Sequence, residues 1–170
     1  VLGDDKVRVV SDSCGEMRTE NRTLIVELGG QETKKAEYYT LNVPYGEKYS
    51  IVLPDGTKVF LNAGTTLRYP DHFEGGSREV YLNGEAYLEV TKDGEHPFVV
   101  KTISSEISVL GTSFNVNARE NSCVTTLVEG RVRMKHGMLD SVELCAGQQA
   151  LLTGVGKIRV QVVDTRYYTS

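Results

Sequence analysis

Residues that could perform nucleophilic catalysis are sparse in this chain. The nearest match to a nucleophile on a sharp turn is Gly111-Thr112-Ser113, but the chain continues into a strand-like run through Phe114 rather than into a helix. A nucleophile also needs a neighbouring base, and His72, His96 and His136 all lie in polar, turn-like contexts. We therefore assign no catalytic residue and expect a protein that is not an enzyme.

The same histidines are the natural candidates for a metal site. Jelly-roll metal sites place two imidazoles at short strand spacing and a carboxylate on the same face. His72, His96 and His136 are widely separated, so all three would have to meet in space. We expect no metal and no cofactor, with convergence of the three histidines as the alternative.

A pair of carboxylates is the next possible source of chemistry. Glu85 and Glu89 share one face of a predicted strand and are about 13 Å apart along it, whereas glycosidase carboxylates are about 5 to 9.5 Å apart. A solvated face, balanced by Arg78 or Lys92, is the better interpretation, and it predicts that Tyr87 is half exposed.

The cysteines lack the spacing of a redox or zinc motif. The chain has three, Cys14, Cys123 and Cys145, and no C-x-x-C pair. Two interpretations stay open: idle or buried thiols, or a disulfide between Cys123 and Cys145, which lie in or beside strand-like runs.

Length and composition favour one domain. A chain of 170 residues can bury a sizeable core without a metal or disulfide. The net charge of -4 disfavours a nucleic-acid surface, and no apolar run approaches the roughly 18 residues of a membrane-spanning helix. Because the first residue is Val1, we expect an excised fragment, with any membrane anchor outside it.

The elements that would position these residues are short strands. Runs rich in Val, Ile, Leu, Phe and Tyr recur at intervals of roughly ten residues and end at turn signals, among them residues 58–61, 98–101, 124–128 and 150–152. The pattern predicts an all-β fold, an antiparallel two-sheet sandwich of jelly-roll type with little or no helix. The structural turn positions are Pro54, Asp55, Gly56, Asn62, Gly64, Asn83, Gly84, Gly111, Gly130 and Gly147.

The clearest predicted hairpin joins residues 78–82 to residues 85–91 through Asn83-Gly84, which suits a type I′ turn. We expect residues 1–40 to form a lead-in and the first strands, packed on the same domain. Residues 41–163 would form the sandwich, and residues 164–170 would begin a tether to a further domain.

Several ordered sequence blocks between Val43 and Leu152 carry a family resemblance. They are Val43-Pro44-Tyr45-Gly46-Glu47, the run from Leu53 to Gly64, Leu67-Arg68-Tyr69-Pro70, the run from Arg78 to Val90, Pro97-Phe98-Val99-Val100, the run from Val109 to Val116, and the run from Leu127 to Val132. These blocks resemble the periplasmic domain of FecR-type anti-sigma regulators in their Bacteroidetes-like form. The chain departs from the family pattern at Cys145-Ala146-Gly147, where a proline is usual, and at Phe60, which often is Trp.

The resemblance implies a relay. In such regulators a cytoplasmic segment controls an extracytoplasmic-function sigma factor, one helix crosses the inner membrane, and the periplasmic part responds to an outer-membrane TonB-dependent transducer. By this resemblance the fragment lies on the periplasmic side of the inner membrane, and its partners are reached mainly through segments outside it. The alternative function is a carbohydrate-binding jelly roll, suggested by nine tyrosines and weakened by the absence of Trp.

Overall fold

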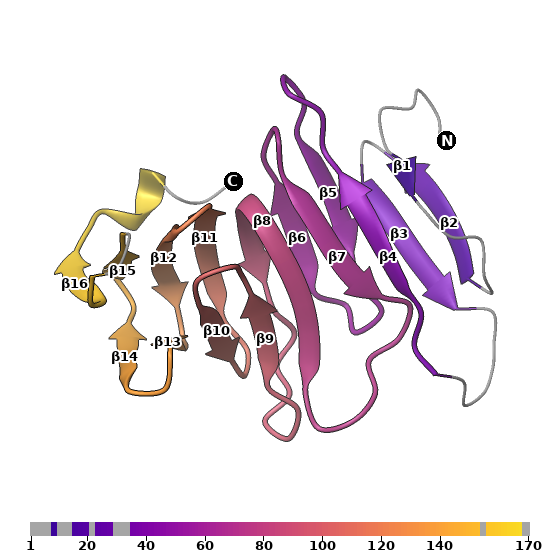
Figure 1. Ribbon diagram of the computed structural model, residues 1–170. Helices are drawn as coiled ribbons and strands as arrows, with labels where there is room; N and C mark the ends of the chain where they lie inside the picture. Colours follow the sequence, from indigo (N-terminus) through magenta and orange to yellow (C-terminus); the bar gives the residue numbers. More distant parts are fainter. Residues whose placement is uncertain (1–7, 10–14, 21–22, 29–34, 154–155, 168–170) are drawn as a thin grey trace.

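The chain folds almost entirely into β-strands (Figure 1). The computed structural model describes the backbone of residues 8–9, 15–20 and 23–28, and residues 35–153 and 156–167 in full. In this part of the chain the single helical element is a 3-10 helix, η1 (Thr165–Tyr167). The all-β prediction is confirmed. The strands are β1 (Arg8–Val9), β2 (Gly15–Glu20), β3 (Thr23–Leu28), β4 (Tyr38–Asn42), β5 (Tyr49–Val52), β6 (Lys58–Leu61), β7 (Thr66–Pro70), β8 (Arg78–Glu89), β9 (Phe98–Lys101), β10 (Glu106–Val109), β11 (Ser113–Arg119), β12 (Ser122–Glu129), β13 (Arg131–His136), β14 (Asp140–Cys145), β15 (Gln148–Leu152) and β16 (Arg159–Val162).

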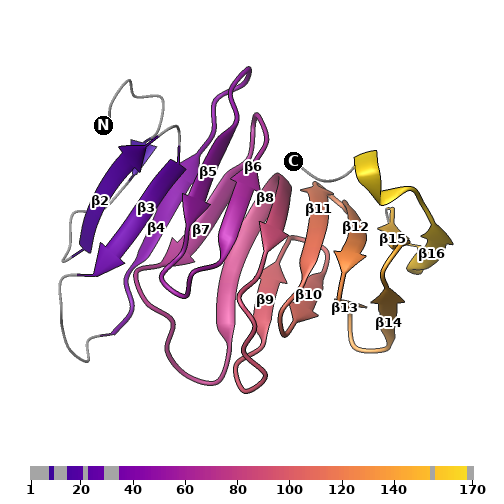
Figure 2. The ribbon, with the colours of Figure 1, turned by 180° about the vertical axis from the view of Figure 1, so that it is seen from behind.

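The strands pair in two ladders that face one another, as Figures 1 and 2 show from opposite sides. The first ladder has the order β1-β4-β7-β8-β9-β10-β13-β14. The second has the order β2-β3-β5-β6-β8-β11-β12-β15-β16. Most pairs are antiparallel, but β3 with β5 and β8 with β9 are parallel.

Strand β8 belongs to both ladders. Its first half pairs with β7 and β9, and its second half pairs with β6 and β11. All the strands are therefore connected in one large sheet that curls on itself and is nearly barrel-shaped. The predicted sandwich of two separate sheets is not confirmed in that detail.

One hydrophobic core fills the space between the ladders. Alternation along each strand supplies it, because successive side chains point to opposite faces. In β4 and β7, for example, Tyr39, Leu41, Leu67 and Tyr69 are buried, while Thr40 and Arg68, which lie between them along the strands, are on the opposite face. The second ladder contributes, among others, Ile51, Val59, Leu61, Leu88, Phe114 and Leu127.

The hairpin predicted at Asn83-Gly84 is wrong, because β8 runs unbroken through both residues. Gly84 has a φ of +126°, and a Cβ there would lie 2.4 Å from Thr65 Oγ1 and 2.7 Å from Thr65 Cα. The Thr65 hydroxyl also accepts a hydrogen bond from Glu85 N (3.0 Å) and donates one to Glu85 O (3.2 Å). The glycine is thus needed for close approach to Thr65 at the point where β8 changes ladder.

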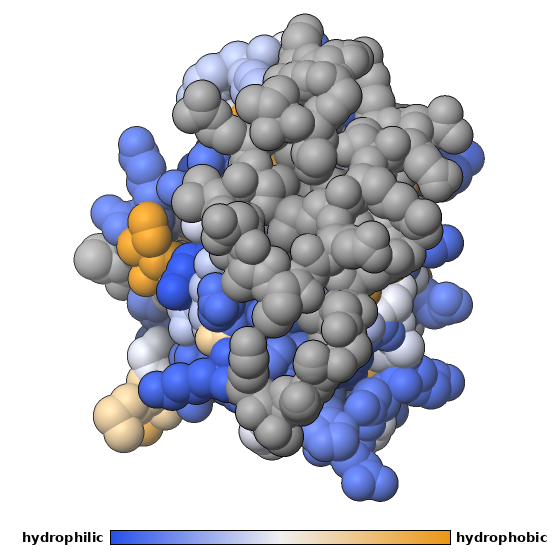
Figure 3. Space-filling view, turned by 90° about the vertical axis from the view of Figure 1, so that its right-hand side faces the viewer, coloured by the Kyte–Doolittle hydropathy of each residue, from blue (hydrophilic) through white to orange (hydrophobic). Residues whose placement is uncertain are grey.

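The outer surface is mostly hydrophilic where the described residues can be seen in Figure 3, and the hydrophobic groups there are isolated. None of the helical segments in the described part of the chain is long and apolar enough to cross a membrane.

Candidate functional site

A buried arginine lies at the start of β8. The side chain of Arg78 is 4% exposed, and its Nη1 atom forms an ion pair of 2.8 Å with Asp55 Oδ2. Arg78 also donates to three carbonyl oxygens, those of His96 (2.7 Å), Thr91 (2.8 Å) and Leu110 (3.3 Å). Its guanidinium carbon lies 5.5 Å from the centroid of the Phe98 ring. Such pairing is required, because an isolated buried charge is very costly.

The partner carboxylate is held by its own turn. Asp55 Oδ1 accepts a hydrogen bond from Thr57 N (3.0 Å), and Asp55 Oδ2 accepts one from the Thr57 hydroxyl (2.8 Å). The same hydroxyl accepts from Thr91 N (3.2 Å). We call Arg78, Asp55, Thr57 and Thr91 the Arg78 cluster. It joins the turn before β6, the chain after β8 and the loop after β10 at one end of the molecule.

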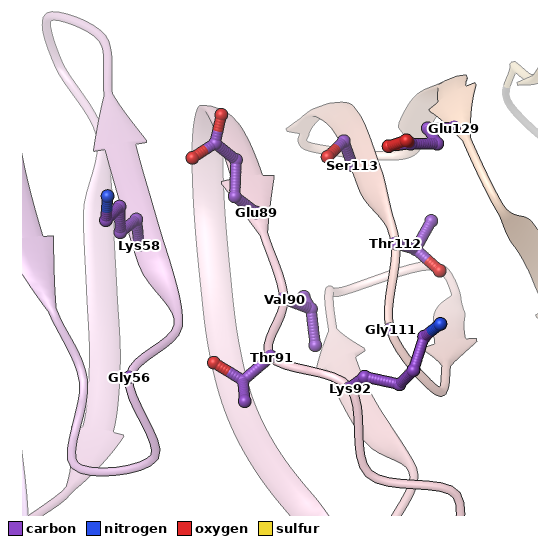
Figure 4. Close-up of a pocket in the computed structure, with 10 residues that line it drawn as sticks. All are labelled: Gly56, Lys58, Glu89, Val90, Thr91, Lys92, Gly111, Thr112, Ser113 and Glu129. Carbon is purple, nitrogen blue, oxygen red and sulfur yellow. The ribbon is translucent and has the colours of Figure 1, made fainter.

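A shallow pocket of about 350 Å³ adjoins the Arg78 cluster (Figure 4). Its charged side chains have both signs: Lys58 and Glu89 stand opposite each other on β6 and β8, while Lys92 and Glu129 line other parts of the wall. The pocket is also lined by Gly56, Val90, Thr91, Gly111, Thr112 and Ser113. The pocket wall therefore presents hydroxyl groups and charges of both signs, which suit a polar ligand or partner better than an apolar one.

The Gly111-Thr112-Ser113 motif, the nearest match to a nucleophile on a sharp turn, lies in the wall of this pocket. Ser113 hydrogen-bonds Tyr87, and burial raises the pKa of this tyrosine although the hydrogen bond from Ser113 lowers it. None of the histidines lines the pocket. His72 contacts Asp71 (2.8 Å), His96 contacts Asp93 (2.9 Å), and His136 contacts the carbonyl oxygen of Ser104 (2.6 Å). Among the described residues no group of three or more His, Cys, Asp or Glu side chains is arranged to hold a metal.

The carboxylate of Glu85 is hydrogen-bonded to other side chains of the fold instead of being fully solvated. Its two carboxylate oxygens accept hydrogen bonds from the side-chain amides of Asn62 (2.9 Å) and Asn115 (3.1 Å). Arg78 does not balance this face, because it points to Asp55. The expectation that Tyr87 is half exposed is also wrong: it is 6% exposed, since β6 and β11 flank it and Phe60 packs 6.0 Å from its ring.

Most of the other predicted turn residues lie between strands. Gly56, Gly64, Gly130 and Gly147 have positive φ angles. Pro54 and Asp55 form the turn between β5 and β6, Asn62 precedes the turn at Gly64, and Gly111 lies in the bend before β11. At Gly111 a Cβ would lie 2.7 Å from the Cα of Lys92, so this glycine lets two loops of the pocket meet.

The two described cysteines are free. Cys123 is buried on β12, where its Sγ atom lies 3.8 Å from Thr125 Oγ1, and burial raises the pKa of its thiol. Cys145 is exposed on β14. The alternative of a disulfide between them is therefore not realised here. Cys14 lies outside the described residues.

The Arg78 cluster and the residues that line the pocket all lie within a segment that matches a family model. A family model described as FecR protein matches residues 39–133. The chain belongs to the FecR family. Two crystal structures of a proposed anti-sigma factor from Parabacteroides distasonis are similar to it. One has 33% sequence identity and a TM-score of 0.73 over 76% of this chain, and the other has 34% and 0.71 over 75%.

This FecR-family chain spans 62% of the length of the first of those structures and 61% of the second. A search among curated proteins gave no match. The sequence did not indicate the Arg78 cluster, because its members lie in three separate segments of the chain. The available signal was a charged residue, Arg78, at a position that alternation places on the same strand face as the apolar Val80 and Leu82.

Proposed function

We propose that this domain is the periplasmic part of a transmembrane anti-sigma regulator. In this role it couples an outer-membrane TonB-dependent transducer to an extracytoplasmic-function sigma factor, and it performs no catalysis. The observation that carries the proposal is the FecR match over residues 39–133. The similarity to structures of a proposed anti-sigma factor supports it.

The proposal gives different tasks to different parts of the regulator. The sigma factor would bind a segment on the far side of the inner membrane, and the transducer would bind mainly through a further domain. The similar structures are longer than the region matched to this chain, which is consistent with such a division. The present domain would connect these parts as a rigid body.

The physical basis for a rigid connection is the sharing of β8 between the ladders. A strand that pairs on both sides along its length cannot shift without breaking hydrogen bonds in both ladders. The Arg78 cluster adds polar contacts between three loops at one end. Protein interiors of this kind transmit displacement because they are close-packed.

Two measurements on the complete protein test the proposal. In the first, alkaline phosphatase or a reporter that is active only in the cytoplasm is fused after residue 163 to identify the compartment of the domain. We expect phosphatase activity, because that enzyme is active only outside the cytoplasm. In the same strain, a promoter dependent on the sigma factor reports signalling. Deletion of residues 43–152, with the flanking segments kept, should uncouple the promoter from the inducing transducer. A reporter active only in the cytoplasm, or a deletion that leaves induction unchanged, would refute the proposal.

A further inference from the structure

The outer face of the first ladder exposes two tyrosines around an arginine. Tyr38 on β4 and Tyr81 on β8 are 37% and 36% exposed, and their ring centroids are 6.2 Å apart in an edge-to-face arrangement. The guanidinium carbon of Arg68 on β7 lies 4.3 Å from the Tyr38 ring centroid and 5.3 Å from that of Tyr81. Lys101 Nζ on β9 lies 5.9 Å from the Tyr81 ring. We call these four residues the tyrosine–arginine patch.

The patch is fixed by strand register. Arg68 is the cross-strand partner of Tyr81, and Tyr81 is the cross-strand partner of Lys101. The residues next to them along the strands, such as Leu67 and Leu82, point into the core. The four strands lie side by side at the front of Figure 1. The patch is therefore a preorganised surface whose side chains lose little freedom on binding.

Arg68 has unused hydrogen-bonding capacity. The two rings hold the face of its guanidinium by cation–π contact, yet within the described residues its N–H groups make no hydrogen bond or ion pair. Lys101, in contrast, is paired with Glu79 at 3.2 Å. A guanidinium held flat with its N–H edge free is well suited to bidentate binding of a carboxylate.

We propose that the tyrosine–arginine patch docks a segment of a partner protein that carries an Asp or Glu, with the carboxylate of that residue on the guanidinium of Arg68. Tyrosine and arginine are among the residue types that are enriched where protein interfaces concentrate their binding energy. The rings supply apolar contact area beside the charge. This docking surface does not depend on the proposed relay, because it would serve a partner of any role.

The surroundings of the patch favour a polypeptide over a polyanion. A hollow of about 410 Å³ adjoins the patch, with Tyr38 and Glu79 in its wall together with Glu74. Those carboxylates, and the net charge of -4, would repel a continuous phosphate backbone. A peptide can place one carboxylate on Arg68 and neutral or basic residues over the hollow.

Peptide selection followed by measured affinities tests the proposal. Random dodecapeptides displayed on phage are panned against the 170-residue chain, and the selected sequences are synthesised with a fluorophore for anisotropy. We expect an Asp or Glu in every selected family. The Kd should weaken at least about tenfold for Arg68→Gln, and less for Arg68→Lys, which keeps the charge but loses the planar fork. Tyr81→Leu should also weaken binding.

Arg133→Gln is the matched control, because Arg133 is an exposed arginine on the same ladder that is already paired with Glu143; it should not change the Kd. Replacing the peptide carboxylate by its amide should match the effect of Arg68→Gln, which keeps the test valid if that variant folds poorly. Failure to select peptides, selection of sequences without acidic residues, or a Kd unaffected by Arg68→Gln or by the amide would overturn the proposal. Displacement of the peptide by oligothymidylate or by a neutral glycan would also overturn it.

Discussion

Replacing Arg78 with Met should destabilise the domain by about 3 kcal/mol. Met keeps much of the apolar stem that packs beside Phe98 but removes the donors to Asp55 and to three carbonyl oxygens. Removing one partner of a buried pair costs about 3 to 5 kcal/mol. The lower end applies here, because Asp55 is 15% exposed and keeps both hydrogen bonds from Thr57.

Urea unfolding followed by far-UV circular dichroism measures this loss, with tyrosine fluorescence as a second probe because the chain has nine Tyr and no Trp. Asp55→Asn should cost about 1.5 kcal/mol. The Arg78→Met, Asp55→Asn double variant should lose about 1.5 kcal/mol less free energy of unfolding than the sum of the two single losses. The reason is that both substitutions remove the same ion pair. Arg133→Met, which breaks an exposed pair, should cause no resolvable change. A loss below about 1 kcal/mol for Arg78→Met, or additive losses within about 0.5 kcal/mol, would refute this account of the Arg78 cluster.

Two further predictions concern β8 and the core. Gly84→Ala should destabilise the domain by more than about 2 kcal/mol, because a Cβ would collide with the backbone of Thr65; Gly76→Ala, with no atom within 4 Å of its Cβ, is the control, and equal urea midpoints would contradict the close approach. Above about pH 9 the free energy of unfolding should fall as pH rises. Burial raises the pKa of Cys123 above its ordinary 9.0 and that of Tyr69 above its ordinary 10.0, so only the unfolded chain releases these protons. Urea midpoints between pH 8 and 11 measure the decline, which Cys123→Ala should reduce; a flat profile would show that neither group is protected.

Strand positions followed from the sequence because they depend on local pattern. The predicted run at residues 58–61 coincides with β6, and the predicted runs at residues 98–101, 124–128 and 150–152 lie within β9, β12 and β15. Alternation of apolar residues and glycine-containing turns is enough to indicate these elements. The parallel pairing of β8 with β9 was not indicated, since strand order depends on contacts between segments distant in the chain.

The Asn83-Gly84 dipeptide shows why a strong local signal can fail. Asn-Gly favours a tight hairpin. Here, however, the glycine is required because a Cβ at position 84 would collide with Thr65, whose hydroxyl hydrogen-bonds to the backbone N–H and C=O of Glu85. The Arg78 cluster was not predicted for a related reason. In the sequence Asp55 is an ordinary turn aspartate, and only the folded chain places Arg78 against it. Tertiary contacts decide both positions.

Strand β8 contains residues of the Arg78 cluster, of the close contact between Gly84 and Thr65, and of the tyrosine–arginine patch. Arg78, the first residue of β8, anchors the strand through its buried contacts. Tyr81, three residues later, is part of the patch on the outer surface, and Gly84 lies where the strand passes into the second ladder. A partner bound at Tyr81 would therefore contact the strand that holds both ladders together. If the domain acts as a relay, such binding would reorient it as a whole, because bending β8 would break hydrogen bonds in two ladders at once. Variants at Gly84 should then impair transmission without weakening partner binding, whereas variants at Arg68 should weaken binding without loosening the fold.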